Sequence, residues 1–218
     1  MSASFTPSEA SSNSQASTSD LRLCIPATMS TAIPSIACLG VIGRNNNPLH
    51  ISIFPSHDPA TNNFTPIRTP LQFSLLLSST IDVFDLRARN NAVSGVGLSG
   101  DFGLLHAVDD RLAAYGFETN TGVRMVCVVD MRGRRVDGSA PVAAASRGAA
   151  AAGLRDAELK PVFRAMQSAY VRLLQNPFYD PDEHAPLGGR GGRKITSRKF
   201  AEDMKRIGEG WTPGVTSL

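Results

Sequence analysis

The apolar run at residues 36–43, Ile-Ala-Cys-Leu-Gly-Val-Ile-Gly, constrains the fold of this chain more than any other segment. It has the length of a β-strand and contains no charged or amide side chain, so both faces of the strand have to be buried. Residues 44–48 then offer three asparagines and a proline, which favour a turn, and apolar and polar residues alternate over 49–53. The pattern predicts a hairpin whose first strand is buried on both faces and whose second strand has one wet face.

A helix is predicted over about 71–90, after a proline-rich segment at 55–70 that we expect to be a loop. Within this helix, apolar residues recur at intervals of three and four, and polar residues fall on a separate stripe. The expected buried positions are Phe73, Leu77, Ile81, Phe84 and Ala88, and the expected outer positions are Ser78, Asp82, Asp85 and Arg89.

Three strand-like segments follow at 102–108, 112–118 and 123–131, and turn sequences separate them. A second helix is expected over 160–175, since a proline is tolerated near its start and an Asn-Pro pair ends it. A third, shorter helix is expected over about 197–207, where a serine can cap the first turn and three apolar residues share a face.

This order of elements predicts an α+β fold with one five-stranded antiparallel sheet. The helix at 71–90 separates the hairpin from the later strands, so the first strand can pair with the last and lie in the middle of the sheet. A length of 218 residues suits one domain. The expected boundaries are a single domain at 35–208, flexible insertions at about 132–153 and 183–195, a disordered Ser/Thr-rich tail at 1–34 and a second tail at 209–218.

The sequence also predicts a cytoplasmic protein. No stretch approaches the roughly 20 apolar residues that a membrane-spanning helix requires. The first 20 residues hold ten Ser or Thr and no basic residue, unlike a secretory signal. Cys24, Cys38 and Cys127 are widely spaced and form neither a disulfide framework nor a metal-binding pair, so we expect reduced thiols.

Positive charge is concentrated near the C-terminal end of the chain. The sequence has 22 Lys and Arg against 19 Asp and Glu, yet seven basic and only two acidic residues lie within 186–206. The basic, Gly-rich loop at 186–199 suggests an alternative function as a nucleic-acid or anionic-membrane binding module. A solvated insertion explains the same charges. The basic residues concerned are Arg190, Arg193, Lys194, Arg198 and Lys199.

No motif for catalysis, metal binding or cofactor binding stands out. Residues 95–100 match Gly-x-Gly-x-x-Gly, but a helix precedes them and a strand follows, the reverse of a dinucleotide site. The histidines His50, His57, His106 and His184 are scattered without the spacing of metal ligands. The sequence therefore predicts a protein that is not an enzyme, with no catalytic residue, no cofactor and no metal.

Several segments together carry a family resemblance. They are the run at 36–43 followed by Asn-Asn-Asn-Pro-Leu, then Ser-Thr-Ile-Asp-Val-Phe-Asp at 79–85, the stretch from Tyr-Gly-Phe to Val-Asp at 115–130, Asn-Pro-Phe-Tyr at 176–179, and an Ile-x-Ser-x-x-Phe pattern at 195–200. In these segments the chain resembles the sedlin family of TRAPP subunits. With insertions excluded, the similarity covers most of the chain from Ile36 to about Ile207.

The resemblance implies a longin-type fold, with one helix on one side of the five-stranded sheet and two on the other. It also implies a non-catalytic adaptor in TRAPP, a multisubunit tethering assembly that activates Rab GTPases in ER-to-Golgi and Golgi vesicle traffic. The implied partners are other TRAPP subunits in a hetero-oligomer and, indirectly, a Rab GTPase, with no nucleic acid. The implied location is the cytoplasm and, through the complex, the periphery of Golgi and ER membranes.

The matched segments supply the candidate partner-binding residues. Asp82, Phe84 and Asp85 lie in the matched Ile-Asp-Val-Phe-Asp segment, where a carboxylate beside an apolar patch could orient a partner. A solvated polar stripe is an equal alternative for Asp82. Phe178 and Tyr179 lie in the matched Asn-Pro-Phe-Tyr segment, where the alternative is structural, with both rings holding the loop against the domain.

Overall fold

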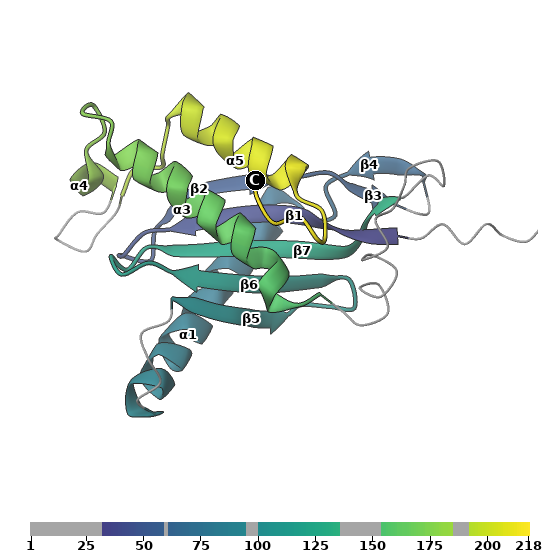
Figure 1. Ribbon diagram of the computed structural model, residues 1–218, viewed down its shortest axis with the longest axis horizontal. Coiled ribbons are helices and arrows are strands. Elements are labelled where there is room, and N and C mark those ends of the chain that lie inside the picture. The colour runs from purple at the N-terminus through teal and green to yellow at the C-terminus, as the bar shows by residue number, and fades with distance from the viewer. Residues whose placement is uncertain (1–31, 59–60, 95–99, 136–153, 185–191) are drawn as a thin grey trace, which may run out of the picture.

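The computed structural model describes residues 32–58, 61–94, 100–135, 154–184 and 192–218 (Figure 1). Most of the expected N-terminal tail, most of the first insertion and all but the last glycine of the Gly-x-Gly-x-x-Gly match lie outside these residues. Within the described part, residues 32–34 belong to the first strand and 132–135 to the last, so the tail and the first insertion were each predicted a few residues too long.

The main sheet has five antiparallel strands in the order β2-β1-β7-β6-β5. This confirms the predicted sheet and the pairing of the first strand with the last. The run at 36–43 lies inside the sheet as expected, although β7 and not β1 occupies the central position. The bounds are β1 Ala32–Ile42, β2 Pro48–Ile53, β5 Asp101–Ala107, β6 Leu112–Glu118 and β7 Arg124–Arg135.

Residues 36–42 of β1 and 125–129 of β7 are apolar because each face of these two inner strands meets a separate core. On β1, Cys38 packs into the core beneath the first helix, whereas Leu39 packs into the core on the opposite face. On β7, Val128 packs into the core beneath the first helix and Cys127 into the core on the opposite face. Side chains alternate between the faces of a strand, so an unbroken apolar run fits a strand that is covered on both sides.

Helix α1, Pro70–Ser94, covers one face of the sheet, and α3, Lys160–Leu174, and α5, Arg198–Gly210, cover the other (Figure 1). A short 3-10 turn, η1, Asp156–Leu159, leads into α3, and the single turn α4, Pro181–His184, follows it. This is the expected α+β arrangement of one helix against two. No helix in the described ranges is long and apolar enough to span a membrane.

The segment expected to be a loop between the hairpin and α1 contains two short strands, β3 Ser56–Asp58 and β4 Asn63–Thr65. A long-range contact holds them in place. Arg111 forms a bidentate pair with the fully buried Asp130 at 3.1 and 2.6 Å, and it also donates to the His57 carbonyl at 3.2 Å. Since these partners are distant in sequence, local patterns give no sign of the hairpin.

The C-terminal segment also differs from the prediction of a tail starting at residue 209. Helix α5 continues to Gly210, and Trp211 is completely buried. Its indole Nε1 donates to the Glu158 carbonyl at 3.2 Å, which ties the end of α5 to η1. A buried indole contributes a large apolar area, so the folded domain extends at least through Trp211.

Candidate partner-binding surfaces

The inner face of α1 is part of the domain core. Phe73, Leu77 and Phe84 are at most 2% exposed. The Phe84 ring packs edge-on against Phe102, with ring centroids 5.1 Å apart, and lies so close to Gly116 that a Cβ there would overlap it. Phe84 was a candidate partner-binding residue, but its side chain has no surface left for a partner.

Asp85 acts inside the domain as well. Its carboxylate accepts a hydrogen bond from Arg124 of β7 at 2.5 Å. The same guanidinium donates to the Asn46 side chain at 2.8 Å and lies 5.5 Å from the centre of the Phe84 ring. Arg124 therefore connects helix α1 to the sheet and to the β1–β2 turn. Asp85 stabilises the fold by accepting the Arg124 hydrogen bond.

The outward side of α1 carries Asp82 together with exposed apolar side chains. We call Leu71, Leu75, Asp82, Leu86 and Val93 the outer α1 stripe. The intervals between them are four, seven, four and seven residues, which places all five on one face of a helix. The exposed fraction of the four apolar members runs from 60% for Leu86 to 89% for Val93.

Two serines beside the outer α1 stripe add little polarity to this surface, because their hydroxyls are already bonded within the helix. The Ser78 and Ser79 hydroxyls donate to carbonyls of the helix itself, those of Ser74 and Leu76, at 3.0 and 2.8 Å. Asp82 is thus a carboxylate flanked by exposed leucines, on a helix face that also carries Ser78 and Arg89. Ala88 was expected to be buried and is exposed, because the C-terminal turns of α1 project past the edge strand β5 (Figure 1).

A second exposed element follows α3. In the Asn176–Tyr179 turn, the Asn176 side chain accepts from the Phe178 N–H at 3.2 Å, and its carbonyl accepts from the Tyr179 N–H at 3.0 Å. Tyr179 stacks on His184 with ring centroids 4.6 Å apart. Burial raises the pKa of the Tyr179 phenol. Phe178 is 95% exposed. The structural interpretation thus fits Tyr179, but it is wrong for Phe178, whose ring is almost uncovered by the described residues.

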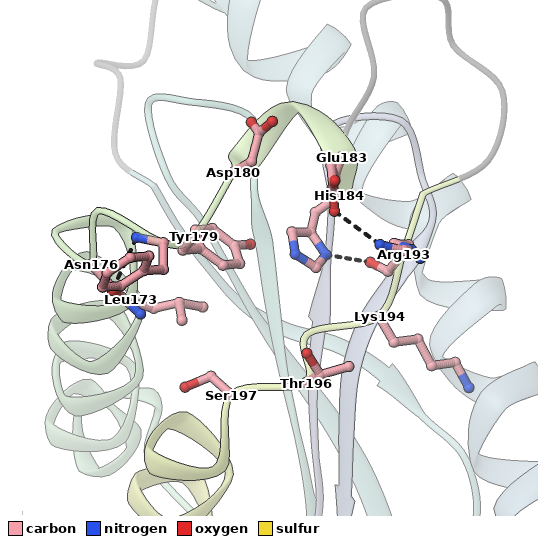
Figure 2. A pocket seen from close by; sticks show the side chains of 11 residues that line it. Leu173, Asn176, Tyr179, Asp180, Glu183, His184, Arg193, Lys194, Thr196 and Ser197 are labelled. Atoms are coloured by element: carbon pink, nitrogen blue, oxygen red, sulfur yellow. Dashed lines mark hydrogen bonds and ion pairs between the residues drawn. The ribbon is translucent and has the colours of Figure 1, made fainter.

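A cavity of about 610 Å³ lies beside this turn (Figure 2). Its walls join segments that are far apart in sequence. His184 Nδ1 donates to the Arg193 carbonyl at 2.6 Å, and the His184 carbonyl accepts from the Asn47 side chain at 2.7 Å. The base of the second expected insertion is therefore fixed to the β1–β2 turn. Residues 185–191 of that insertion lie outside the described ranges.

Two of the basic residues behind the alternative function are already paired. Arg193 contacts Glu183 at 3.2 Å and Arg198 contacts Glu202 at 2.8 Å. Lys194 and Lys199 form no ion pair with the part of the chain that the structure describes, and Arg190 lies outside that part. Pairing lowers the net charge that this region offers to a polyanion, since phosphate binding depends on uncompensated cations.

The described cysteines are poorly suited to covalent chemistry. Cys38 and Cys127 are fully buried and unpaired. Burial raises the pKa of Cys38 to about 12 and also raises that of Cys127. The thiolate is the reactive form, so both side chains behave as small apolar groups. Among the described residues, no group of three or more His, Cys, Asp or Glu side chains is placed to hold a metal ion.

Comparisons with known proteins agree with this architecture. The sequence model of the sedlin family matches residues 41–210. A trafficking protein particle complex subunit 2-like protein of Dictyostelium discoideum is 25% identical over 174 residues, 79% of this chain and 95% of that protein.

Vertebrate proteins of the same description are also similar. The Mus musculus protein is 28% identical over 167 residues, covering 75% of this chain and 89% of that protein. The Xenopus tropicalis protein is 28% identical over 148 residues, covering 67% and 84%. The family match spans most of the chain, from the end of β1 through helix α5. The chain belongs to the sedlin family.

Proposed function

We propose that this chain is a non-catalytic adaptor subunit of a TRAPP complex. Its sedlin-family membership and its relatives' description as trafficking protein particle complex subunits support this role. The observation that carries it is the outer α1 stripe. Four large apolar side chains lie exposed on one helix face, and an extended apolar surface of this kind is typical of a protein–protein interface.

The energetics of the stripe favour a protein partner over exposure to water. Covering a leucine-sized side chain contributes about 1.5–3 kcal/mol, so several of them can offset part of the cost of immobilising two proteins. Asp82 would add specificity, because a carboxylate inside an apolar contact requires a donor or a basic group opposite it. The surface thus combines apolar affinity with one polar requirement.

The proposed setting follows from this role. The chain would assemble with other TRAPP subunits in the cytoplasm and reach Golgi and ER membranes peripherally, through the complex. It would support the assembly of a Rab guanine-nucleotide exchange complex in ER-to-Golgi and Golgi vesicle traffic. Contact with the Rab GTPase would be indirect, through the assembled complex.

Co-purification of the full chain with the other TRAPP subunits of its own organism tests the proposal. The experiment is run at about 0.15 M and about 0.5 M salt, because screening shortens from roughly 8 Å to a few Å over that range. A double variant, Leu75→Glu with Leu86→Glu, disrupts the outer α1 stripe. The double variant Lys205→Glu with Arg206→Glu alters exposed α5 positions and serves as the matched control.

We expect fixed-ratio recovery of TRAPP subunits at both salt concentrations for the wild type and the control, and loss of at least one subunit for the stripe variant. Failure of the wild type to recover TRAPP subunits at either concentration would contradict the proposal. Recovery of only nucleic-acid-associated proteins, lost at high salt, would instead support the basic loop as the functional site.

A further inference from the structure

We infer that the Asn176–Phe178 turn is a second docking element, which inserts the Phe178 ring into an apolar pocket on another subunit. That pocket is bordered by a basic side chain that pairs with Asp180. The inference rests on the proposed role in a complex and adds a second interface to it. Sequence alone places these residues in a matched segment, whereas the structure distinguishes the outward ring from its inward neighbour.

The exposure of Phe178 is extreme for an aromatic side chain. At 95% it exceeds that of every other large apolar residue in the described ranges, including Phe64 at 59%. Phe64 is partly covered by an edge contact with His57, at a centroid distance of 5.5 Å. An aromatic ring buries roughly 150–250 Å² in a contact. Phe178 therefore offers the area of a strong interface residue and uses almost none of it inside the domain.

The turn holds this ring in a preformed position. The Asn176 side chain and carbonyl each accept a backbone N–H of the turn, and Pro177 restricts the backbone between them. Tyr179, next in sequence, is held by its stack on His184. Since the backbone is already ordered, binding through Phe178 costs little more than fixing two side-chain torsions.

One carboxylate beside the adjoining cavity, that of Asp180, is available to a basic partner residue. Asp180 forms no ion pair among the described residues, and one carboxylate oxygen caps the Asp182 N–H at 2.9 Å. Because a carbonyl only accepts, the His184 Nδ1 N–H is committed to the Arg193 carbonyl. The C-terminal end of α3 adds partial negative charge. In Figure 2 the Lys194 side chain points away from Tyr179 and His184.

The position of the turn permits two partners at once. Helix α1 lies on one side of the sheet, and the turn between α3 and α4 lies on the other (Figure 1). A subunit covering the outer α1 stripe would leave Phe178 free. The two surfaces therefore suit a chain that bridges two neighbours in an assembly.

The test uses the full chain and purified TRAPP subunits of the same organism in a reconstituted complex. Phe178→Ala removes the ring and Asp180→Lys reverses the charge. Phe64→Ala is the matched control, an exposed phenylalanine on the distant β4 strand. A variant with a photo-reactive benzoyl-phenylalanine at position 178 then identifies the subunit and the residues within reach.

We expect Phe178→Ala to weaken the binding of one subunit by roughly tenfold to a hundredfold, as at interface hot spots, without changing the melting temperature. Asp180→Lys should weaken the same subunit, Phe64→Ala should not, and the cross-link should map to an apolar pocket beside a Lys or Arg. Subunits held by the outer α1 stripe should stay bound in all three variants.

A reconstituted complex in which Phe178→Ala changes no affinity and position 178 cross-links to no subunit would overturn this inference. The proposed function would survive that result, because assembly through α1 would remain. If the wild-type chain binds none of the subunits, the proposed function itself fails. A cross-link to a pocket without a basic residue, with Asp180→Lys binding normally, would overturn the charge pairing.

Discussion

Helices α1 and α5 both cover the sheet with an apolar face, yet their outer faces differ. On α5, Phe200, Met204 and Ile207 are buried, and the opposite side carries ion pairs one turn apart. These pairs are Arg198–Glu202 at 2.8 Å and Lys205–Glu209 at 3.8 Å. On α1 the outer face carries exposed leucines and a valine together with Ser78, Asp82 and Arg89.

Under the proposed function, the outer face of α5 stays in contact with water and the outer face of α1 is covered by a partner protein. Charged pairs keep α5 hydrated and add little to stability, because exposed pairs are worth about 0–1 kcal/mol. The apolar side chains of the outer α1 stripe form no hydrogen bonds with water, and because they are exposed they contribute little to the stability of the core. These side chains become useful only when another surface covers them, which is why α1 and not α5 is the expected contact with a partner.

The largest effect should come from the inner face of α1. Phe84→Ala removes a fully buried ring that packs on Phe102, and we expect a loss of about 3–5 kcal/mol in the free energy of unfolding. Leu86→Ala, two residues further on and 60% exposed, should change it by less than about 0.5 kcal/mol. Denaturant titration of the two variants checks the contrast, and equal losses would show that the faces of α1 are wrongly assigned.

A smaller loss should come from the inner face of α5. A Cβ at Gly208 would overlap three atoms of the Phe54 ring, so Gly208→Ala forces the ring or the helix to shift. We expect a destabilisation of about 1–3 kcal/mol, despite the higher helix propensity of alanine. Gly210→Ala is the matched control, because a Cβ there has its nearest neighbour at 3.7 Å. A Gly208→Ala variant as stable as wild type would contradict the packing.

Asp82→Lys should weaken binding to the partner without lowering the stability of the domain. Asp82 is exposed on the outer α1 stripe, so we expect the melting temperature to stay nearly unchanged. Binding of the α1 partner should fall by about tenfold or more, because the lysine would place a like charge against the partner's donor. Thermal unfolding and subunit binding are measured on the same preparation. A large drop in melting temperature would assign Asp82 an internal role instead.

The smallest effect should come from the outer face of α5. Lys205→Ala breaks a long, exposed ion pair, and we expect a change of less than about 0.5 kcal/mol in the free energy of unfolding and none in subunit binding. Surface plasmon resonance with the assembled partner subunits checks the second part. Weakened binding would place a partner on α5 and remove the contrast between the two helices.

Sequence patterns predicted the main sheet because β1 and β7 contain unbroken apolar runs, at 36–43 and 125–129, and this signal depends on nearby residues alone. Patterns did not reveal β3 and β4, since Arg111 and Asp130 hold them from a distance. Trp211 looked like part of a tail because its partner, Glu158, lies 53 residues earlier.

Some candidate partner-binding residues are exposed and others are buried or paired, again because of contacts with residues that are distant in sequence. Asp82 and Phe178 are exposed, whereas Phe84, Asp85 and Tyr179 are held by Phe102, Arg124 and His184. No local pattern gives these partners. The outer α1 stripe did leave a readable signal, because Leu75, Leu86 and Val93 are in helical phase with Asp82. A helix that is apolar on both sides has a weak amphipathic pattern, so the inner stripe alone was recognised.

The most direct test of the account is the rate at which a maleimide labels single cysteines on the two outer faces. Leu75→Cys and Glu202→Cys are compared in a Cys24→Ser background, where Cys38 and Cys127 are buried and unreactive. On assembly with TRAPP subunits, labelling at position 75 should slow by at least about tenfold, as water is excluded there, while labelling at position 202 stays unchanged. Equal rates at position 75 in the free and assembled chain, or protection at position 202 alone, would contradict it.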